Sequence, residues 1–193
     1  MTNNTKNIMI VGVGGQGTLL ASRLLGNAAV SAGFDVKVSE VHGMSQRGGS
    51  VVTYVRYGDK VYSPIVEKGC ADVILAFEEL EAYRWIEYLK PEGTLIVNTQ
   101  QKDPMPVITG AMEYPKNILQ TLRDKGIHTV TVNALEKAQQ AGTAKAVNVV
   151  LMGVFAALSP MKREQFEAAL TATVPSKFLE MNQKAFALGY ESV

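Results

Sequence analysis

The sequence predicts a doubly wound α/β fold with a mostly parallel sheet, a β-hairpin addition and a helical C-terminal tail. Short apolar runs rich in β-branched residues alternate with segments of helical periodicity, as they do in α/β domains. The first run, residues 8–11, leads into a cluster of glycines that opens a helix, and from Ser159 onward the pattern is helical throughout. We treat residues 1–193 as a single domain, because this length suits one α/β unit with a sizeable core.

The glycine cluster is the first candidate binding site. Its glycines match the pattern G-x-G-x-x-G, in which the first permits a tight turn, the second admits a phosphate and the third lets helix and strand pack closely. The helix expected over residues 18–32 would direct free N–H groups and its positive dipole end at this loop. The sequence therefore predicts a Rossmann-like anion site formed by Gly12, Gly14, Gly15, Gln16 and Gly17. A tight turn that binds no nucleotide is the alternative.

The acidic residue that a dinucleotide site requires is ambiguous. An NAD site places Asp or Glu at the end of the second strand, about 20 residues after the glycine loop, where it holds the ribose. The second strand is expected over residues 34–41, because Gly33 ends the preceding helix. Asp35 has a suitable spacing but begins this strand, whereas Glu40 ends the strand but comes late. The β-α-β unit itself predicts parallel strands joined by a right-handed crossover.

A second loop, residues 41–50, carries three glycines around an arginine. Loops that leave the carboxyl ends of strands line the ligand crevice of a doubly wound sheet, so this loop is expected to face the first one. Arg47 would supply a planar charged fork for phosphate or carboxylate, while Gly48 and Gly49 permit close backbone approach. The alternative is that Arg47 pairs with a nearby glutamate, Glu40 or Glu67, and only orders the loop.

A β-hairpin is expected next. Residues 51–57 alternate in character, Gly58 and Asp59 form a turn, and residues 60–62 return as the second strand. The hairpin would extend the sheet edge in antiparallel fashion or form an arm for a partner. Its tyrosines would serve either an interface or packing on the sheet of this chain, and they are Tyr54, Tyr57 and Tyr62.

Two carboxylates follow the next buried strand, residues 71–77. Glu78 and Glu79 begin the helix expected over residues 78–89, where the helix dipole favours acidic side chains. A catalytic carboxylate pair is one interpretation, and capping of the helix is the favoured one. Asn98 then ends a further strand, residues 94–98, near the expected crevice.

The rest of the chain alternates in the same way. A polar segment containing prolines, residues 100–106, predicts an exposed loop or insertion. Further elements are expected as a helix over 115–125, a strand over 127–132, a short helix over 133–140 capped by Asn133, and a helix over 144–158. The last of these is apolar on nearly every face, so we expect it to be buried against the sheet and its neighbours or against another subunit.

Composition excludes several classes of function. The net charge is +1 with both signs scattered, so no nucleic-acid or anionic-membrane partner is indicated. No signal peptide and no apolar run of about 18 residues is present, which predicts a cytoplasmic protein. Cys70 is the only cysteine, and two histidines stand far apart, so neither a four-thiolate cluster nor another metal site is expected. We expect no catalytic residue in this chain.

The two glycine loops together resemble a known family. The first loop with Ala21 one turn into its helix, the Gly-Met-Ser-Gln-Arg-Gly-Gly-Ser sequence of residues 43–50, and Gly-x-Leu-Ile-Val-Asn at residues 93–98 are similar to the gamma-type domain of 2-oxoacid:ferredoxin oxidoreductases. Within that family the chain is most similar to the small beta subunit of the indolepyruvate type, in its length and in the Gln46-Arg47 form of the second loop. The resemblance spans most of the chain.

The resemblance implies a role in anaerobic metabolism. The family converts a 2-oxoacid, coenzyme A and oxidised ferredoxin to acyl-coenzyme A, carbon dioxide and reduced ferredoxin. It places thiamine diphosphate and Fe-S clusters on a large alpha subunit, and it implies a dimer of heterodimers that meets ferredoxin as a complex. This chain would then be inactive alone, and its glycine loop, faced by Arg47, would suit the diphosphate of coenzyme A. A stand-alone NAD- or flavin-binding oxidoreductase and a ligand-free assembly module remain as alternatives.

Overall fold

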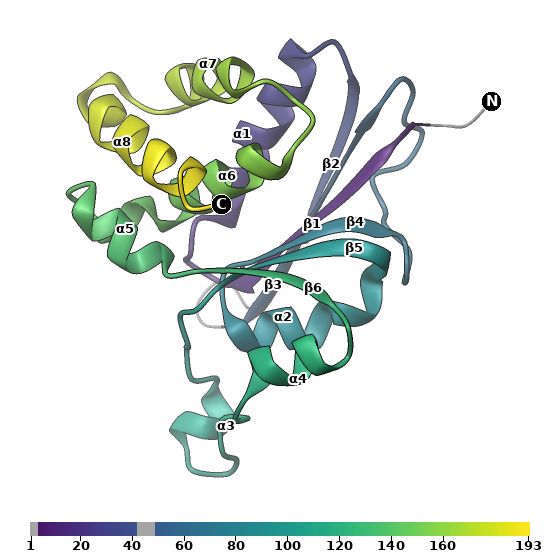
Figure 1. Ribbon diagram of the computed structural model, residues 1–193, viewed down its shortest axis with the longest axis vertical. Coiled ribbons are helices and arrows are strands. Elements are labelled where there is room, and N and C mark those ends of the chain that lie inside the picture. Colours follow the sequence, from purple (N-terminus) through teal and green to yellow (C-terminus); the bar gives the residue numbers. More distant parts are fainter. Residues whose placement is uncertain (1–3, 42–48) are drawn as a thin grey trace.

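The computed structural model describes residues 4–41 and 49–193, which form helices packed around one mixed β-sheet (Figure 1). In this part of the chain the strands are β1 (Lys6–Val13), β2 (Asp35–Val41), β3 (Ser50–Gly58), β4 (Ala71–Ala76), β5 (Leu89–Asn98) and β6 (His128–Val132). The helices are α1 (Thr18–Ser31), α2 (Glu79–Trp85), α3 (Met105–Ile108), α4 (Ile118–Asp124), α5 (Ala134–Gln140), α6 (Val147–Leu158), α7 (Arg163–Thr173) and α8 (Leu179–Tyr190). Short 3₁₀ helices are η2 (Ile86–Tyr88), η3 (Ala144–Ala146) and η4 (Ser176–Phe178). The predicted α/β alternation and helical tail are confirmed.

The sheet has the strand order β2-β3-β1-β4-β5-β6. Neighbouring strands run parallel from β1 through β4 and β5 to β6, whereas β3 is antiparallel to both β1 and β2. The mostly parallel, doubly wound sheet is therefore confirmed. The expected β-α-β unit differs in one respect, because β1 and β2 run in the same direction but are separated by β3.

The hairpin is formed by β2 and β3, and the prediction that residues 60–62 provide its second strand is wrong. β3 pairs with β1 along one edge and with β2 along the other, so no edge is left for residues 60–62. These residues lie outside the strands, and Val61 donates its N–H to the Asp35 carboxylate at 2.9 Å. The turn at Gly58 therefore ends β3 without returning the chain to the sheet.

Some helices are shorter than the sequence predicted. The helix expected over residues 78–89 ends at Trp85 and η2, because Leu89 already pairs with Ala71 at the start of β5. The helix expected over residues 115–125 begins at Ile118, after Asn117 adopts a left-handed conformation with φ of 58°. These boundaries lengthen β5 and leave a long connection between β5 and α4.

Helices cover both faces of the sheet (Figure 1). α2 and α4 pack on the face that presents Met9 and Ile74, while α1 and α6 pack on the face that presents Ile10 and Leu75, and α7 and α8 pack on α1 and α6. Since β1 is buried on both faces, it has the continuous apolar sequence that a central strand requires. The first ten residues of α6 are all buried between the sheet and its helical neighbours, which confirms the predicted burial of this helix.

The tyrosines of the β3 region divide between two environments. Tyr54 and Tyr57 are buried, and the Tyr57 ring lies with its centroid 5.4 Å from that of Phe34. Tyr62, in contrast, is 85% exposed. Packing on the sheet of this chain therefore accounts for two of the three tyrosines.

We expect stability to fall at alkaline pH through Tyr57. Burial raises the pKa of Tyr57 to about 12 from an ordinary value of 10.0. The folded state then holds the phenol proton more tightly than the unfolded state, so the stabilisation is complete below pH 10 and is lost as pH rises toward 12. We expect Tyr57 to account for a loss of roughly 2–3 kcal/mol in the free energy of unfolding across this window.

Urea denaturation between pH 8 and pH 12 measures this effect. Tyr57→Phe should reduce the alkaline loss, whereas Tyr62→Phe, at an exposed position, should leave it unchanged. An equally steep loss in Tyr57→Phe and the wild type would contradict the assignment to Tyr57.

Candidate functional site

The glycine loop lies between two adjacent strands whose following helices pack on opposite faces of the sheet. It connects β1 to α1, which packs on one face, and it lies beside the carboxyl end of β4, whose following helix α2 packs on the other face. In open α/β sheets the crevice at such a switch point is the usual place for a ligand. The fold therefore puts the loop where the sequence predicted a binding site.

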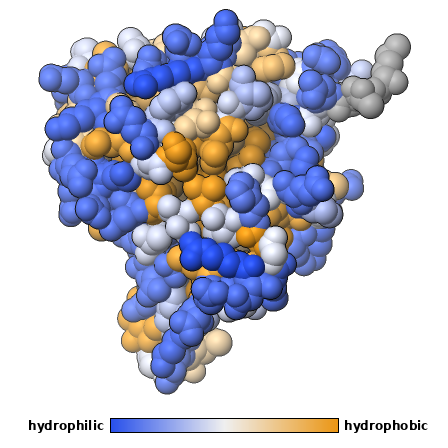
Figure 2. Space-filling model, viewed as in Figure 1, coloured by the Kyte–Doolittle hydropathy of each residue, from blue (hydrophilic) through white to orange (hydrophobic). Residues whose placement is uncertain are grey.

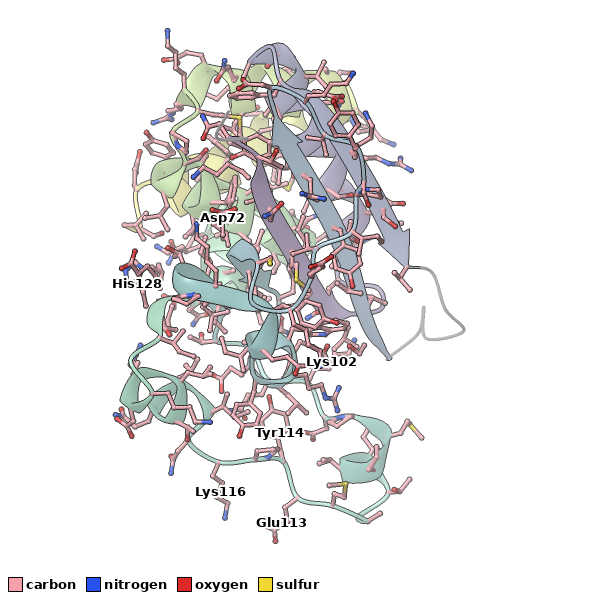
Figure 3. The ribbon with its side chains drawn as sticks, turned by 90° about the vertical axis from the view of Figure 1, so that its right-hand side faces the viewer. Asp72, Lys102, Glu113, Tyr114, Lys116 and His128 are labelled. Carbon is pink, nitrogen blue, oxygen red and sulfur yellow. The ribbon has the colours of Figure 1, made fainter. Side chains whose placement is uncertain are left out.

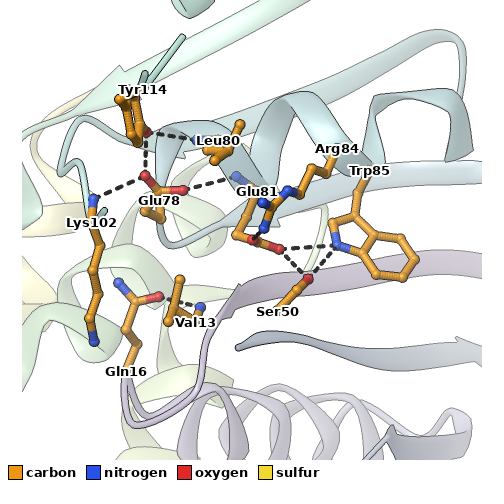
Figure 4. Close-up of polar contacts among 10 residues, drawn as sticks. All are labelled: Val13, Gln16, Ser50, Glu78, Leu80, Glu81, Arg84, Trp85, Lys102 and Tyr114. Carbon is orange, nitrogen blue, oxygen red and sulfur yellow. Dashed lines mark hydrogen bonds and ion pairs between the residues drawn. The ribbon is translucent and has the colours of Figure 1, made fainter. Parts of the chain in front are cut away.

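Gln16 shapes this loop with its side chain (Figure 4). Its Oε1 accepts the N–H of Val13 at 2.7 Å, and its Nε2 donates to the carbonyl of Phe77 at 3.2 Å. A Cβ at position 12 would lie 2.8 Å from Gln16 Oε1 and 3.0 Å from the Cβ of Phe77, so Gly12 leaves the space that Gln16 occupies. Gln16 thus joins the ends of β1 and β4.

The other glycines of the pattern have distinct roles. Gly14 donates its N–H to the carbonyl of Gly49 at 2.9 Å, which brings the residue before β3 onto the loop. Gly17 has φ of 85°, and a Cβ there would lie 2.6 Å from Nδ2 of Asn148. That amide donates to the carbonyl of Gly17 at 3.2 Å, so the loop is tied to the start of α6 as well. Gly15, with φ of 94°, has open space around it.

Two hollows flank the loop and differ in charge. The first has a volume of about 210 Å³, and its lining includes Gly14, Gly15 and the carboxylate-bearing Glu40. The second has a volume of about 500 Å³, its lining includes Gly15, Gln16, Gly17 and Lys145, and none of the described residues that line it carries a carboxylate. An anion is favoured in the second hollow, because Lys145 and the positive end of the α1 dipole both attract it.

A third cavity continues from Lys145. It has a volume of about 340 Å³ and is mostly apolar, with Phe178 and Met181 among its lining residues. Lys145 therefore lines both the hollow at the glycine loop and the more apolar cavity between α6 and α8. This arrangement suits an extended ligand with an anionic centre and a less polar arm.

The structure brings together most of the residues predicted for the site. Gly12, Gly14, Gly15, Gln16 and Gly17 form the loop, and Gly49 contacts it directly. Arg47 and Gly48 lie outside the described residues. Sequence reasoning missed Lys145 and Asn148, which come from the distant start of α6. The sequence near them contains one recognisable feature, Thr143, which is a residue type that caps helices. Its hydroxyl accepts the N–H of Lys145 at 3.2 Å and caps η3.

The structure also shows where the two acidic residues considered for a dinucleotide site lie. Asp35 lies at the start of β2, where hydrogen bonds from the Lys37 side chain and the Val61 N–H lower its pKa. Glu40 is the acidic residue that lines a hollow at the glycine loop, and its carboxylate accepts a hydrogen bond from the Ser22 hydroxyl at 3.0 Å. The smaller hollow beside Glu40 lies below the usual range of about 300–1,000 Å³ for ligand pockets.

Glu78 caps α2, which confirms the favoured interpretation of the carboxylate pair. Its carboxylate is 1% exposed and accepts the N–H of Glu81 at 2.9 Å, the N–H of Lys102 at 3.1 Å and the hydroxyl of Tyr114 (Figure 4). Burial, followed by the hydrogen bond to Glu78, raises the pKa of Tyr114 above its ordinary value. The carboxylate is therefore fully engaged in holding structure.

Two kinds of feature are absent from residues 4–41 and 49–193. No group of three or more His, Cys, Asp or Glu side chains is arranged to hold a metal ion, and Cys70 is a free, exposed thiol. The described residues also contain no helix with the length and apolar character needed to span a bilayer.

Comparison with known proteins decides the family. The sequence pattern of the family described as "Pyruvate ferredoxin/flavodoxin oxidoreductase" matches residues 7–192. The chain belongs to this family. It is 44% identical to the indolepyruvate oxidoreductase subunit IorB of Thermococcus kodakarensis, over 96% of this chain and 95% of that one. The resemblance recognised in the two loops is thus confirmed, and the chain is a small subunit of a 2-oxoacid ferredoxin oxidoreductase.

Solved structures of known proteins agree with the fold. The gamma subunit of a keto/oxoacid ferredoxin oxidoreductase from Geobacter sulfurreducens has a TM-score of 0.73 at 27% identity, over 97% of each chain. A 2-oxoglutarate:ferredoxin oxidoreductase from Magnetococcus marinus has a TM-score of 0.76 at 19% identity, and the match covers 100% of this chain but 31% of that one. The same fold therefore occurs both as a separate subunit and as part of a longer polypeptide. These relatives favour a subunit over the stand-alone oxidoreductase.

Proposed function

We propose that this subunit serves a complex that oxidises an arylpyruvate, with indolepyruvate as the expected substrate. The proposal is supported by similarity to IorB over nearly the full length of both chains. In the proposed reaction the bond between the carboxylate and the keto carbon of the 2-oxoacid breaks and releases carbon dioxide. The acyl group is transferred to the sulfur of coenzyme A, the thiol proton is released, and two electrons pass to oxidised ferredoxin. Thiamine diphosphate, which stabilises the carbanion, and Fe-S clusters would reside on a large partner subunit, in a dimer of heterodimers.

We further propose that this chain binds the diphosphate of coenzyme A at the glycine loop. The binding residues would be Gly12, Gly14, Gly15, Gln16, Gly17, Arg47, Gly48 and Gly49. The observation that carries the proposal is the hollow of about 500 Å³ between this loop and Lys145, which attracts anions and adjoins an apolar cavity of a size suited to a pantetheine arm. In this arrangement Gln16 maintains the loop shape, and Lys145 supplies a charge that the sequence did not reveal.

Replacing Lys145 by alanine is expected to weaken the use of coenzyme A. A charge-assisted hydrogen bond to phosphate contributes about 1.5–3 kcal/mol, so the KM for coenzyme A should rise roughly tenfold to a hundredfold. The kcat should change little, because Lys145 is proposed to hold a part of the ligand remote from the reacting thiol. Anaerobic reduction of ferredoxin by indolepyruvate, measured with the whole complex at varied coenzyme A, gives both constants.

Lys184→Ala provides the matched control, since Lys184 is an exposed lysine on α8 that lines none of these hollows. Arg47→Ala should alter either coenzyme A dependence or assembly of the complex. If Lys145→Ala and Arg47→Ala both behave like the control, the coenzyme A assignment is wrong.

A ligand-free assembly module is the second candidate function. It is favoured by one observation, the bond from the Gly14 N–H to Gly49, which removes from the loop an amide that a phosphate would otherwise use. This alternative expects the Lys145 and Arg47 variants to leave the KM for coenzyme A unchanged. The kinetic experiment therefore separates the two candidates.

A further inference from the structure

The connection between β5 and α4 projects away from the body of the protein. We call residues 100–117 the α3 segment, after the one short helix within it (Figure 1). Most of its residues are exposed, so it adds little to either half of the core. Connections in compact domains usually span about 4–6 residues, and a much longer one is usually functional or disordered.

The base of the α3 segment is held in a defined position. Lys102 near its start and Tyr114 near its end both donate hydrogen bonds to the buried carboxylate of Glu78 (Figure 4). The Tyr114 hydroxyl also accepts the N–H of Leu80 at 3.1 Å. Both ends of the segment are thus anchored on the first turn of α2, which limits the conformations of the part between them.

The tip of the segment is apolar and exposed. Met105, Ile108 and Met112 are 63%, 65% and 65% exposed, and residues 104–112 include no charged side chain. Figure 2 shows hydrophobic atoms on this lower projection, beside hydrophilic ones. Exposed apolar groups rimmed by polar residues indicate an interaction surface, and methionine adapts readily to the shape of a partner.

Charges of both signs flank the tip. Lys102 and Asp103 precede it, and Glu113 and Lys116 follow it. In Figure 3, Glu113 and Lys116 point away from the body of the protein. A partner complementary to this pattern needs an apolar groove with charges of both signs at its rim.

We propose that the α3 segment is a docking element, and that its tip enters an apolar groove on the large subunit of the complex. The existence of that subunit rests on the proposed function. A subunit of different fold is favoured over a second copy of this chain, because the same fold occurs as 31% of a longer polypeptide in the Magnetococcus marinus enzyme, where it is joined to other parts of an oxidoreductase. An anchored base lowers the entropy that the tip loses on binding, which favours a stable complex.

Binding of purified variants to the large subunit tests the proposal. The triple variant Met105→Gln, Ile108→Gln, Met112→Gln should fold normally, because all three side chains are exposed. Its dissociation constant for the large subunit, measured anaerobically, should rise at least tenfold. The control replaces three exposed apolar residues outside the segment, as Tyr62→Gln, Ile65→Gln and Val193→Gln, and should change the constant less than twofold.

Two further measurements test whether the large subunit covers the tip and whether the anchored base contributes to binding. Hydrogen exchange at residues 104–112 should slow when the whole complex forms. Tyr114→Phe retains the tip but removes a hydrogen bond at the base, so it should weaken binding by an intermediate factor. Wild-type affinity in the triple variant, or unchanged exchange at the tip, would overturn the docking role.

The outcomes also separate this proposal from the proposed function. If no thiamine-dependent large subunit binds the wild-type chain, both fail together. If such a subunit binds the triple variant as tightly as the wild type, only the docking proposal fails. Self-association of the free chain that the triple variant abolishes would instead assign the tip to a second copy of this chain and overturn the proposal.

Discussion

Replacing Gly153 by alanine is expected to destabilise the protein by roughly 3 kcal/mol, because α6 and α8 touch backbone to backbone at this position. A Cβ on Gly153 would lie 2.2 Å from the carbonyl oxygen of Phe186 and 2.8 Å from the N atom of Tyr190. The same close approach is found from the side of α8 at Gly189, where a Cβ would lie 2.0 Å from the carbonyl oxygen of Val150. Since backbone atoms cannot rotate away, the two helices must separate, and α6 fills the core. Urea denaturation measures the loss.

Gly26→Ala is the matched control. Gly26 also lies inside a helix, α1, but the nearest atom to a Cβ there is 3.8 Å away, an ordinary contact. Alanine should therefore stabilise this position by about 0.5–1 kcal/mol, through helix propensity alone. A gain in stability at both glycines would show that α6 and α8 can move apart without cost, contrary to our expectation.

The contrast between Gly26 and Gly153 shows what the sequence can predict about packing. The apolar character of α6 on all sides was enough to predict its burial, because no face could be left in water. The contact of Gly153 with α8 depends on where two helices cross, and neither helix alone encodes that point. The sequence pattern identifies the buried helix, and only the assembled fold identifies its closest neighbour.

The sheet shows the same limit. Alternating residues predicted β3 as a strand, but such a pattern does not specify which strands become its neighbours. The turn at Gly58 favoured a local hairpin with residues 60–62, whereas the observed fold pairs β3 with β1 and β2. Pairing on both edges of a long strand forms more backbone hydrogen bonds than a hairpin of three residues.

In the candidate site, the sequence predicted the residues of the glycine loop, but it did not predict the residues that reach the loop from distant segments of the chain. The glycine pattern located the loop from its own residues, because Gly12 leaves space for the Gln16 side chain and Gly15 and Gly17 adopt positive φ angles. Lys145 and Asn148 reach the loop from more than a hundred residues away. Their placement follows from the packing of α6 across the sheet, which the order of residues in the chain does not reveal.

Replacing Glu78 by alanine is expected to have an effect as large as that at Gly153. The carboxylate accepts hydrogen bonds from Glu81, Lys102 and Tyr114, and removing it leaves these three donors without their acceptor. Hydrogen bonds to a charged group contribute about 1.5–3 kcal/mol each, so for three of them we expect a loss of at least roughly 4–5 kcal/mol in the free energy of unfolding. Thermal or urea denaturation of the isolated chain measures this loss.

Two variants distinguish the effect of losing the carboxylate acceptor from the effect of losing a helix cap and from the effect of losing side-chain volume. Asn133→Ala removes the N-cap of α5, which accepts the single N–H of Glu136 at an exposed position, and should cost about 1 kcal/mol. Glu78→Gln retains the volume but places an NH₂ donor among N–H and O–H donors, so its cost should fall between those of the two alanine variants. If Glu78→Ala costs no more than Asn133→Ala, the carboxylate is an ordinary cap. The α3 segment must then be held by other contacts, because Glu78 is the acceptor that its two ends share.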